Sequence, residues 1–129
     1  MTKLQGSFDV TSWNEETYEE LPDGGKLTRA VVEQVVSGDI VGEGAVRWFM
    51  AYLADGTAHF VGLQRVRGTI DGRSGTFLME TSGEFDGTEA HGSWTVVAGT
   101  EALEGLRGTG GFRAPHGSHA TWELDVELG

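Results

Sequence analysis

Four histidines are the first residues to consider for metal or acid–base chemistry. His116 and His119 stand in the segment His116-Gly-Ser-His119, a spacing at which two rings can share a metal ion. Zinc sites use at least three protein ligands, and this Pro-Gly turn has no third ligand nearby. His59 and His91 occupy positions that alternate outward in their predicted strands. The histidines therefore favour solvated surface positions, and we predict no metal site.

Asp39, Glu43 and Tyr52 are the candidate acid–base residues if the protein is an enzyme. Asp39 and Glu43 flank the turn in GDIVGEG, which leads into the strand that ends at Tyr52. We expect this turn at the mouth of the fold, where carboxylates and a phenol can exchange protons with a substrate. The structural alternative is that Asp39 caps a turn through its side chain, as Asp often does.

Three other segments resemble known sites without matching them. Five carboxylates lie between residues 15 and 23, but they lack the fixed spacing of calcium ligands, so a solvated loop after a first strand from Gln5 to Trp13 is expected. Ser74 lies on a hairpin turn and lacks the spacing of a nucleophile elbow. The glycines between residues 105 and 110 precede no helix that would complete a phosphate site.

Composition excludes several classes of partner. The chain of 129 residues has a formal net charge of -11, so nucleic acid and anionic membranes would repel it. It has no cysteine, which excludes disulfides, thiolate ligands and a cysteine nucleophile. No stretch approaches the roughly 18 apolar residues of a membrane span. We expect a soluble cytoplasmic protein that binds neither nucleic acid nor membrane and uses no cofactor.

Alternating apolar and polar residues divide the chain into about eight short strands. Turns built on Asp55-Gly56 and Asp71-Gly72 separate such runs, which is the strongest short-range signal for hairpins. The 21 glycines make helices unfavourable after residue 38. We predict an all-β, antiparallel up-and-down barrel formed by one domain over residues 1–129, because ring closure removes exposed strand edges. A two-sheet sandwich is the alternative.

The positions of the charged residues predict which face of each strand is inside. The opposite faces carry aromatic, apolar and neutral polar side chains. The predicted lining is Phe8, Gln34, Trp48, Met50, Tyr52, Phe60, Gln64, Phe77, Met79, Thr81, Trp94, Phe112 and Trp122, and all of these except Phe8 and Phe112 are candidate ligand-binding residues. Such residues either fill a small barrel or surround one small ligand. The two glutamines favour a pocket, because an unpaired buried amide costs about 1–3 kcal/mol.

The outer face of the second to fourth strands carries an apolar strip. Its members are Val31, Val35, Phe49, Leu53, Val61 and Leu63. An exposed strip of this kind usually marks an interface, so we expect a homo-oligomer that associates through these strands. The loop expected between residues 15 and 25 could cover the strip instead.

Several segments of the chain resemble one bacterial family. They are SFDVTSW, GDIVGEG, MAYLADGTAHFVGLQRV, GRSGTF, SWTVVAG, GLRGTGGF and TWELDVEL, and together they resemble the family known as domain of unknown function 3224. The resemblance implies an eight-stranded barrel similar in fold to allene oxide cyclase, and it implies no agreed activity. Thr81 stands where a histidine is usual, and residues 98–101 replace an expected proline and Gly-Ser-Gly run. Any chemistry of that histidine would be lacking here.

These observations lead to two hypotheses about function. The first is a barrel that binds a small apolar or amphipathic molecule in its lumen, and that could act as an isomerase or cyclase by folding a flexible substrate. The second is a non-catalytic carrier, or a structural homo-oligomeric module with a filled core. A fold does not determine a reaction. The presence or absence of an interior cavity distinguishes a binding barrel from a filled one.

Overall fold

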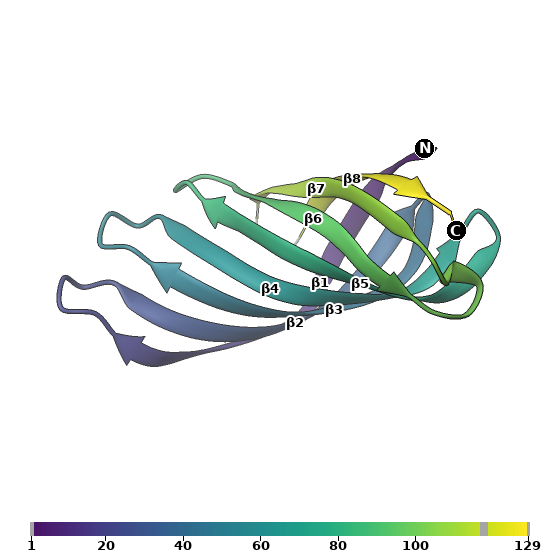
Figure 1. The fold of residues 1–129 in the computed structure, drawn as a ribbon. Helices are drawn as coiled ribbons and strands as arrows, with labels where there is room; N and C mark the ends of the chain where they lie inside the picture. Colours follow the sequence, from purple (N-terminus) through teal and green to yellow (C-terminus); the bar gives the residue numbers. More distant parts are fainter. Residues whose placement is uncertain (1, 117–118, 129) are drawn as a thin grey trace.

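The structure is a computed structural model, and it describes residues 2–116 and 119–128. Eight antiparallel strands form a closed ring in chain order (Figure 1). They are β1 (Thr2–Glu20), β2 (Lys26–Gly38), β3 (Ile40–Tyr52), β4 (Ala58–Ile70), β5 (Arg73–Phe85), β6 (Ala90–Gly99), β7 (Arg107–His116) and β8 (His119–Glu127), with a short 3-10 helix, η1 (Glu101–Leu103), before β7. The predicted up-and-down barrel is confirmed. No helix in the described ranges is long and apolar enough to cross a membrane.

The alternation of side chains along the strands builds the core. In β2, for example, Thr28, Ala30, Val32, Gln34 and Val36 are buried, while the residues between them are exposed. Every residue of the predicted lining is buried except Tyr52, which is partly buried at the end of β3. The residues that alternate with the buried ones include the charged side chains, which stay in solvent. The two-residue repeat of each strand therefore determines which face of the sheet points into the lumen.

One end of the barrel is filled by apolar side chains from its connections. Leu103 of η1 and Leu106 are 1% and 0% exposed, and they belong to the same core cluster as Ile40 and Ile70. Glycine permits this packing, since a Cβ added at Gly99 would overlap the backbone carbonyl oxygen of Leu103. The barrel is therefore closed at the end where β2 connects to β3, β4 to β5, and β6 to β7.

The first strand is longer than the sequence predicts. β1 continues to Glu20, where a solvated loop was expected after Trp13, so that expectation was wrong. A bulge between Val10 and Ser12 shifts the register against β2, and Trp13 and Glu15 then lie opposite two inward-facing residues of β2. Pairing with the long strand β2 outweighs the low strand preference of the glutamates.

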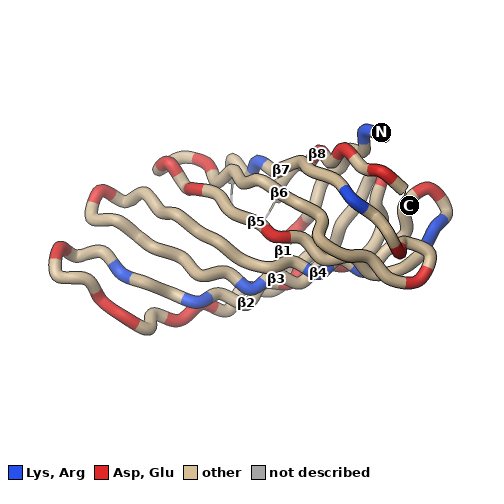
Figure 2. The backbone as a smooth tube through the Cα atoms, viewed as in Figure 1, with Lys and Arg blue, Asp and Glu red and all other residues tan. Residues whose placement is uncertain are grey.

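The ring closes along only part of β1. β8 pairs with Thr2–Asp9, whereas in the described parts of the chain Val10–Glu20 pairs with β2 alone. The second half of β1 is therefore an edge strand. Its acidic residues, which lie on the β1–β2 hairpin in Figure 2, oppose pairing with a strand of another molecule. The acidic run of the sequence is thus explained by a strand edge and not by a loop.

Candidate binding cavity

A cavity of about 330 Å³ lies inside the barrel at the end opposite η1. The walls come from β1 to β7, and two residues near the turns at this end, Thr88 and Pro115, contribute to the rim. The lining side chains are aromatic, aliphatic or neutral polar, and none of them carries a charge. A cavity of this size and composition is typical of a site for a small molecule.

The structure divides the predicted ligand-binding residues into two groups. Six of them line the cavity, namely Gln34, Trp48, Met50, Tyr52, Phe60 and Gln64. Phe77, Met79, Thr81, Trp94 and Trp122 are buried in the core but do not line the cavity. The alternation of side chains along each strand identifies the inward-facing residues. It does not show at which position along the barrel axis these side chains leave a cavity.

Other lining residues were missed by the sequence analysis. Trp13 reaches the cavity because of the bulge in β1, and Thr88 and Pro115 lie where the strands meet the turns. The sequence signal for Trp13 was its residue type, since tryptophan is highly buried on average though rarely completely so.

Aromatic rings connect the cavity to the core beneath it. Trp48 and Phe60 meet edge to face with ring centroids 4.7 Å apart, and the centroid of Phe112 lies 5.8 Å from that of Phe8. The ring of Trp94 is tilted by 39° against that of Phe112, with the centroids 5.8 Å apart. Aromatic pairs in edge-to-face geometry contribute about 0.5–1.5 kcal/mol each beyond their buried area, so these contacts stabilise the arrangement of the cavity walls.

A pair of glutamines forms the polar part of the cavity lining. The side-chain amide of Gln64 donates a hydrogen bond to Oε1 of Gln34 at 2.8 Å, and the two residues are 2% and 5% exposed. Gly44 leaves room for the pair, because an added Cβ would lie 2.8 Å from that oxygen. The bond uses one N–H and one carbonyl, so each amide retains a second polar group for another partner.

Two further polar groups are buried without a partner. Within the described residues, neither Oγ1 of Thr81 nor Nε1 of Trp94 makes a hydrogen bond. The two residues are opposite each other in the β5–β6 pair, and Trp94 packs on Phe8 and Phe112 of the cavity lining. An unmade hydrogen bond in the interior costs about 1–3 kcal/mol. This interior therefore has unused capacity for hydrogen bonding.

Glu15 is held at the rim of the cavity by side chains from three strands. Its Oε2 accepts hydrogen bonds from the hydroxyl of Thr28 at 2.6 Å and from that of Tyr52 at 2.7 Å. Its Oε1 accepts one from the indole N–H of Trp13 at 2.9 Å. Trp13 and Tyr52 both line the cavity, so the carboxylate is fixed directly beside it.

The environment shifts the pKa values of Glu15 and Tyr52 in opposite directions. Burial alone raises the pKa of Glu15, but hydrogen bonds from Thr28, Tyr52 and Trp13 and the charge of Lys26 outweigh it, so the pKa falls below the ordinary 4.5. Burial, followed by the hydrogen bond to Glu15 and its charge, raises the pKa of Tyr52 well above 10. At neutral pH Glu15 is ionised and Tyr52 keeps its proton.

The other two acid–base candidates lie away from the cavity. Asp39 is in the turn between β2 and β3, at the opposite end from Tyr52, and its Oδ2 accepts a hydrogen bond from the backbone N–H of Gln5 at 2.9 Å. Glu43 is exposed on the outer face of β3, opposite Arg67 of β4. The structure therefore brings neither of them together with Tyr52.

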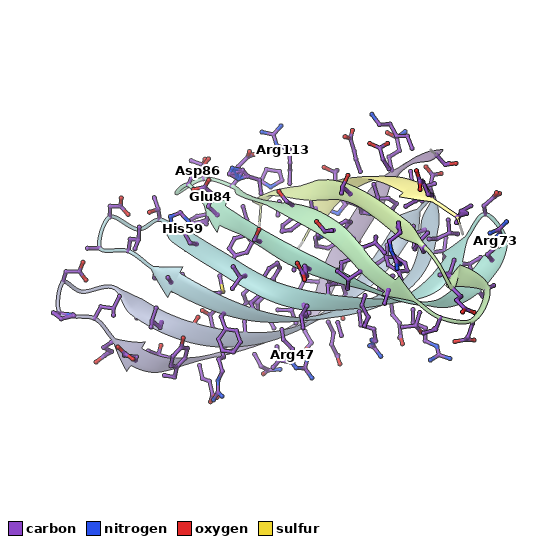
Figure 3. All side chains as sticks on the ribbon, viewed as in Figure 1. Arg47, His59, Arg73, Glu84, Asp86 and Arg113 are labelled. Carbon is purple, nitrogen blue, oxygen red and sulfur yellow. The ribbon has the colours of Figure 1, made fainter. Side chains whose placement is uncertain are left out.

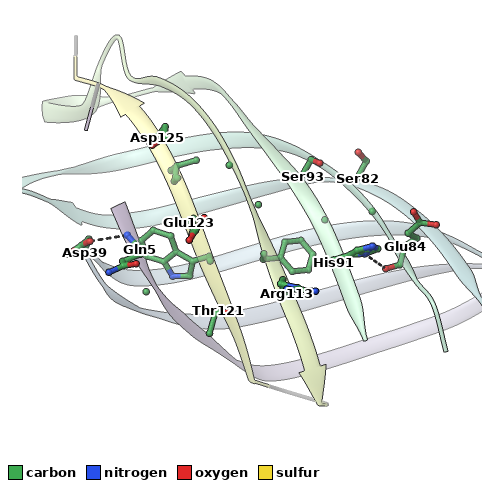
Figure 4. A pocket seen from close by; sticks show the side chains of 18 residues that line it. Gln5, Asp39, Ser82, Glu84, His91, Ser93, Arg113, Thr121, Glu123 and Asp125 are labelled. Atoms are coloured by element: carbon green, nitrogen blue, oxygen red, sulfur yellow. Dashed lines mark hydrogen bonds between the residues drawn. The ribbon is translucent and has the colours of Figure 1, made fainter. Parts of the chain in front are cut away.

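A larger hollow of about 1000 Å³ lies on the outer surface of β5 to β8 and the start of β1 (Figure 4). Polar side chains line it, but the contacts shown in Figure 4 are to backbone atoms: Nδ1 of His91 lies 3.4 Å from the carbonyl oxygen of Glu84, and Asp39 binds the backbone of Gln5. Arg113, another lining residue, is paired with the carboxylate of Glu89. Because these three groups are already bonded within the chain and the hollow is on the outer face, we regard the interior cavity as the better candidate site.

The described residues contain no group of three His, Asp or Glu side chains that could hold a metal ion. The His116–His119 segment includes residues 117 and 118, which lie outside the described residues. Nδ1 of His119 is 2.9 Å from Oδ1 of Asp9.

Comparison with known proteins identifies the family. Residues 4–126 match the family described as protein of unknown function (DUF3224). The chain belongs to the DUF3224 family. A crystal structure of a DUF3224 protein of unknown function from Shewanella oneidensis MR-1 is similar, with a TM-score of 0.83 and 26% sequence identity, over 100% of this chain and 98% of that chain. No curated protein matches.

The family resemblance noted from the sequence is thereby confirmed for nearly the whole DUF3224 chain. The expected likeness of its fold to allene oxide cyclase is not confirmed by these comparisons. Because the family is described as being of unknown function, the activity of the chain has to be inferred from its own geometry.

Proposed function

We propose that the chain binds one small apolar or amphipathic molecule in the interior cavity. The observation that carries this proposal is the cavity itself, about 330 Å³ lined by rings and aliphatic side chains, with the paired amides of Gln34 and Gln64 as its polar group. A core that served only to stabilise the barrel would be packed to a density that leaves few voids larger than a water molecule.

The pKa shifts favour binding over an isomerase or cyclase reaction that uses Glu15 and Tyr52. A general base works best with a pKa near the operating pH, as does a general acid. Here the pKa of Glu15 is lowered and that of Tyr52 is raised, so both move away from neutrality. The pair is suited to holding a fixed charge and a fixed hydrogen-bond donor.

Uptake of a neutral apolar dye tests the proposal. N-phenyl-1-naphthylamine should bind at one site per chain with increased fluorescence, and 1-octanol should displace it. Ala90→Trp should prevent uptake, because residue 90 lines the cavity at the start of β6 and a large side chain there fills it. Thr95→Trp, at an exposed position of the same strand, is the matched control. If the wild type takes up no dye, the filled structural module replaces the binding barrel.

We also propose that a second copy of the chain docks on the outer face of β2 to β4. Val31, Val35, Phe49, Leu53, Val61 and Leu63 are all exposed there, as the sequence predicts. Tyr18 of β1 packs edge to face on Phe49 and covers only part of the strip. Arginines and glutamates surround the strip, and Arg47 projects from this face in Figure 3. A two-fold axis can place carboxylates of one copy against guanidinium groups of the other.

A further inference from the structure

Carboxylates lie on β1 and on the β1–β2, β3–β4 and β5–β6 turns at the cavity end of the barrel. Glu15 of β1 is ionised and exposed at the rim, and it receives hydrogen bonds from the lining residues Trp13 and Tyr52. The turns at this end add Asp23, Asp55, Asp86 and Glu89. Hydrogen bonds from neighbouring residues of the same turns lower the pKa values of Asp55 and Asp86, the latter to about 2, so both stay ionised.

The positive groups at this end of the barrel are fewer. Arg113 binds the carboxylate of Glu89 at 2.8 Å, so its charge is already paired. Figure 3 shows Arg113 and His59 at this end of the barrel, close to the carboxylates of Glu84 and Asp86. His91 lies against the backbone of Glu84 on the outer surface. Lys26 reaches the rim itself. The field at the mouth therefore attracts cations and repels anions.

The rings at the rim already bind a cation from within the chain. Nζ of Lys26 lies 5.2 Å from the centroid of the Tyr52 ring, within the range of a cation–π contact. Trp13 and Trp48 line the same cavity as Tyr52. Aromatic walls combined with one carboxylate are the usual means of recognising an alkylated ammonium group. Lys26 thus marks a place that the ammonium group of a ligand could take.

The second observation pointing to a ligand is inside the cavity. Gln34 and Gln64 are more than nine-tenths buried, line the cavity and use only part of their hydrogen-bonding capacity on each other. The lining between this pair and Glu15 is uncharged and largely aromatic. The site therefore offers a carboxylate at the mouth, an apolar middle and neutral amides within.

We propose that the ligand is a hydrophobic cation, an amine or quaternary ammonium compound whose apolar body occupies the cavity and whose ammonium group lies at Glu15. The inference rests on the proposed function and names the class of ligand for that cavity. The ammonium group replaces Lys26 at the Tyr52 ring. A fatty acid with a similar apolar body should bind much more weakly, because its carboxylate would face Glu15 and the acidic turns.

Three probes with one octyl chain and different head groups test this inference. The wild type should bind octyltrimethylammonium about tenfold more tightly than octanoate, with 1-octanol between them, as measured by calorimetry or dye displacement. Added salt should weaken binding of the cation and leave binding of octanol nearly unchanged, because only the cation depends on charge attraction.

Two variants of β1 separate the role of Glu15 from net charge. Glu15→Gln keeps an acceptor for Thr28 and Tyr52 but should weaken cation binding at least fivefold without affecting octanol. Glu16→Gln, the control, removes the same charge from the neighbouring residue, which pairs outward with Arg29, and should bind all three probes like the wild type. Lys26→Gln should strengthen cation binding, since it removes the competing ammonium group.

The outcomes distinguish this inference from the proposed function. Equal affinities for the three probes, or cation binding that does not depend on salt, overturn the hydrophobic cation and leave a general apolar cavity. If none of the probes binds the wild type, the binding function itself fails. Salt dependence is measured on the wild type, so a poorly folded variant does not prevent a decision.

Discussion

At the scale of single residues, Glu15 connects the sequence, the fold and the candidate site. Three hydrogen-bond donors from β1, β2 and β3 converge on one carboxylate, so ionisation of Glu15 and the packing of the three strands support each other. Hydrogen bonds to a charged group contribute about 1.5–3 kcal/mol where they are shielded from water. Partial exposure reduces that contribution here.

The lowered pKa of Glu15 predicts how stability changes in acid. The ionised form is favoured by folding, so its contribution is fully present above the ordinary pKa of 4.5 that Glu15 has in the unfolded chain, and it disappears as pH falls through the lower folded pKa. The urea midpoint of the wild type should therefore fall more steeply below about pH 4.5 than that of Glu15→Gln. Glu16→Gln is the control for removing one carboxylate from β1. Parallel pH profiles for the wild type and Glu15→Gln would contradict the prediction.

At the scale of elements, strand alternation was enough to predict the ring and its interior. The charged positions of β2, β4 and β8 assign one face of each strand to solvent, and this assignment needs no long-range information. The bulge in β1 could not be predicted in this way. It arises from the register with β2, and Val10-Thr11-Ser12 has no glycine or proline to mark it.

The candidate site shows the same division between local and non-local information. Gln34, Trp48 and Gln64 were predicted because each follows the period of its own strand. Glu15 was missed because its contacts with Thr28 and Tyr52 depend on the bulge. Asp39 was proposed because the sequence does not reveal which end of the barrel is open, and the structure closes the end at which Asp39 lies. The volume of the cavity depends on how side chains from several strands meet, which no single segment encodes.

The packing of η1 gives a prediction for one element. Gly99→Ala should destabilise the barrel by about 1–3 kcal/mol, because the new methyl group overlaps the carbonyl oxygen of Leu103 and displaces the closed end. Chemical unfolding measures the loss, and Thr95→Ala on the exposed face of β6 is the control. Dye uptake should stay unchanged, since the cavity lies at the other end. Wild-type stability of Gly99→Ala would show that η1 shifts freely.

At the scale of the whole molecule, the proposed interface predicts a change in mass. The wild type should elute as an oligomer in size-exclusion chromatography with light scattering, and Phe49→Asp should shift it towards the monomer, because a buried unpaired carboxylate opposes docking. Phe49 is 52% exposed in the single chain, so the substitution leaves the core intact. Val97→Asp, on the exposed face of β6, should not change the mass. A monomeric wild type would remove the interface.

The incomplete closure of the ring along β1 also has a kinetic consequence. Phe8, Val10 and Trp13 form one wall of the cavity, and the wall from Val10 onward is hydrogen-bonded along a single side. Segments secured on one side detach at a lower free energy than those within a continuous sheet. A bound molecule would then leave when residues 10–20 separate from β2. Its dissociation rate would therefore correlate with the rate of amide hydrogen exchange in Val10–Glu20 and not with the width of a pore.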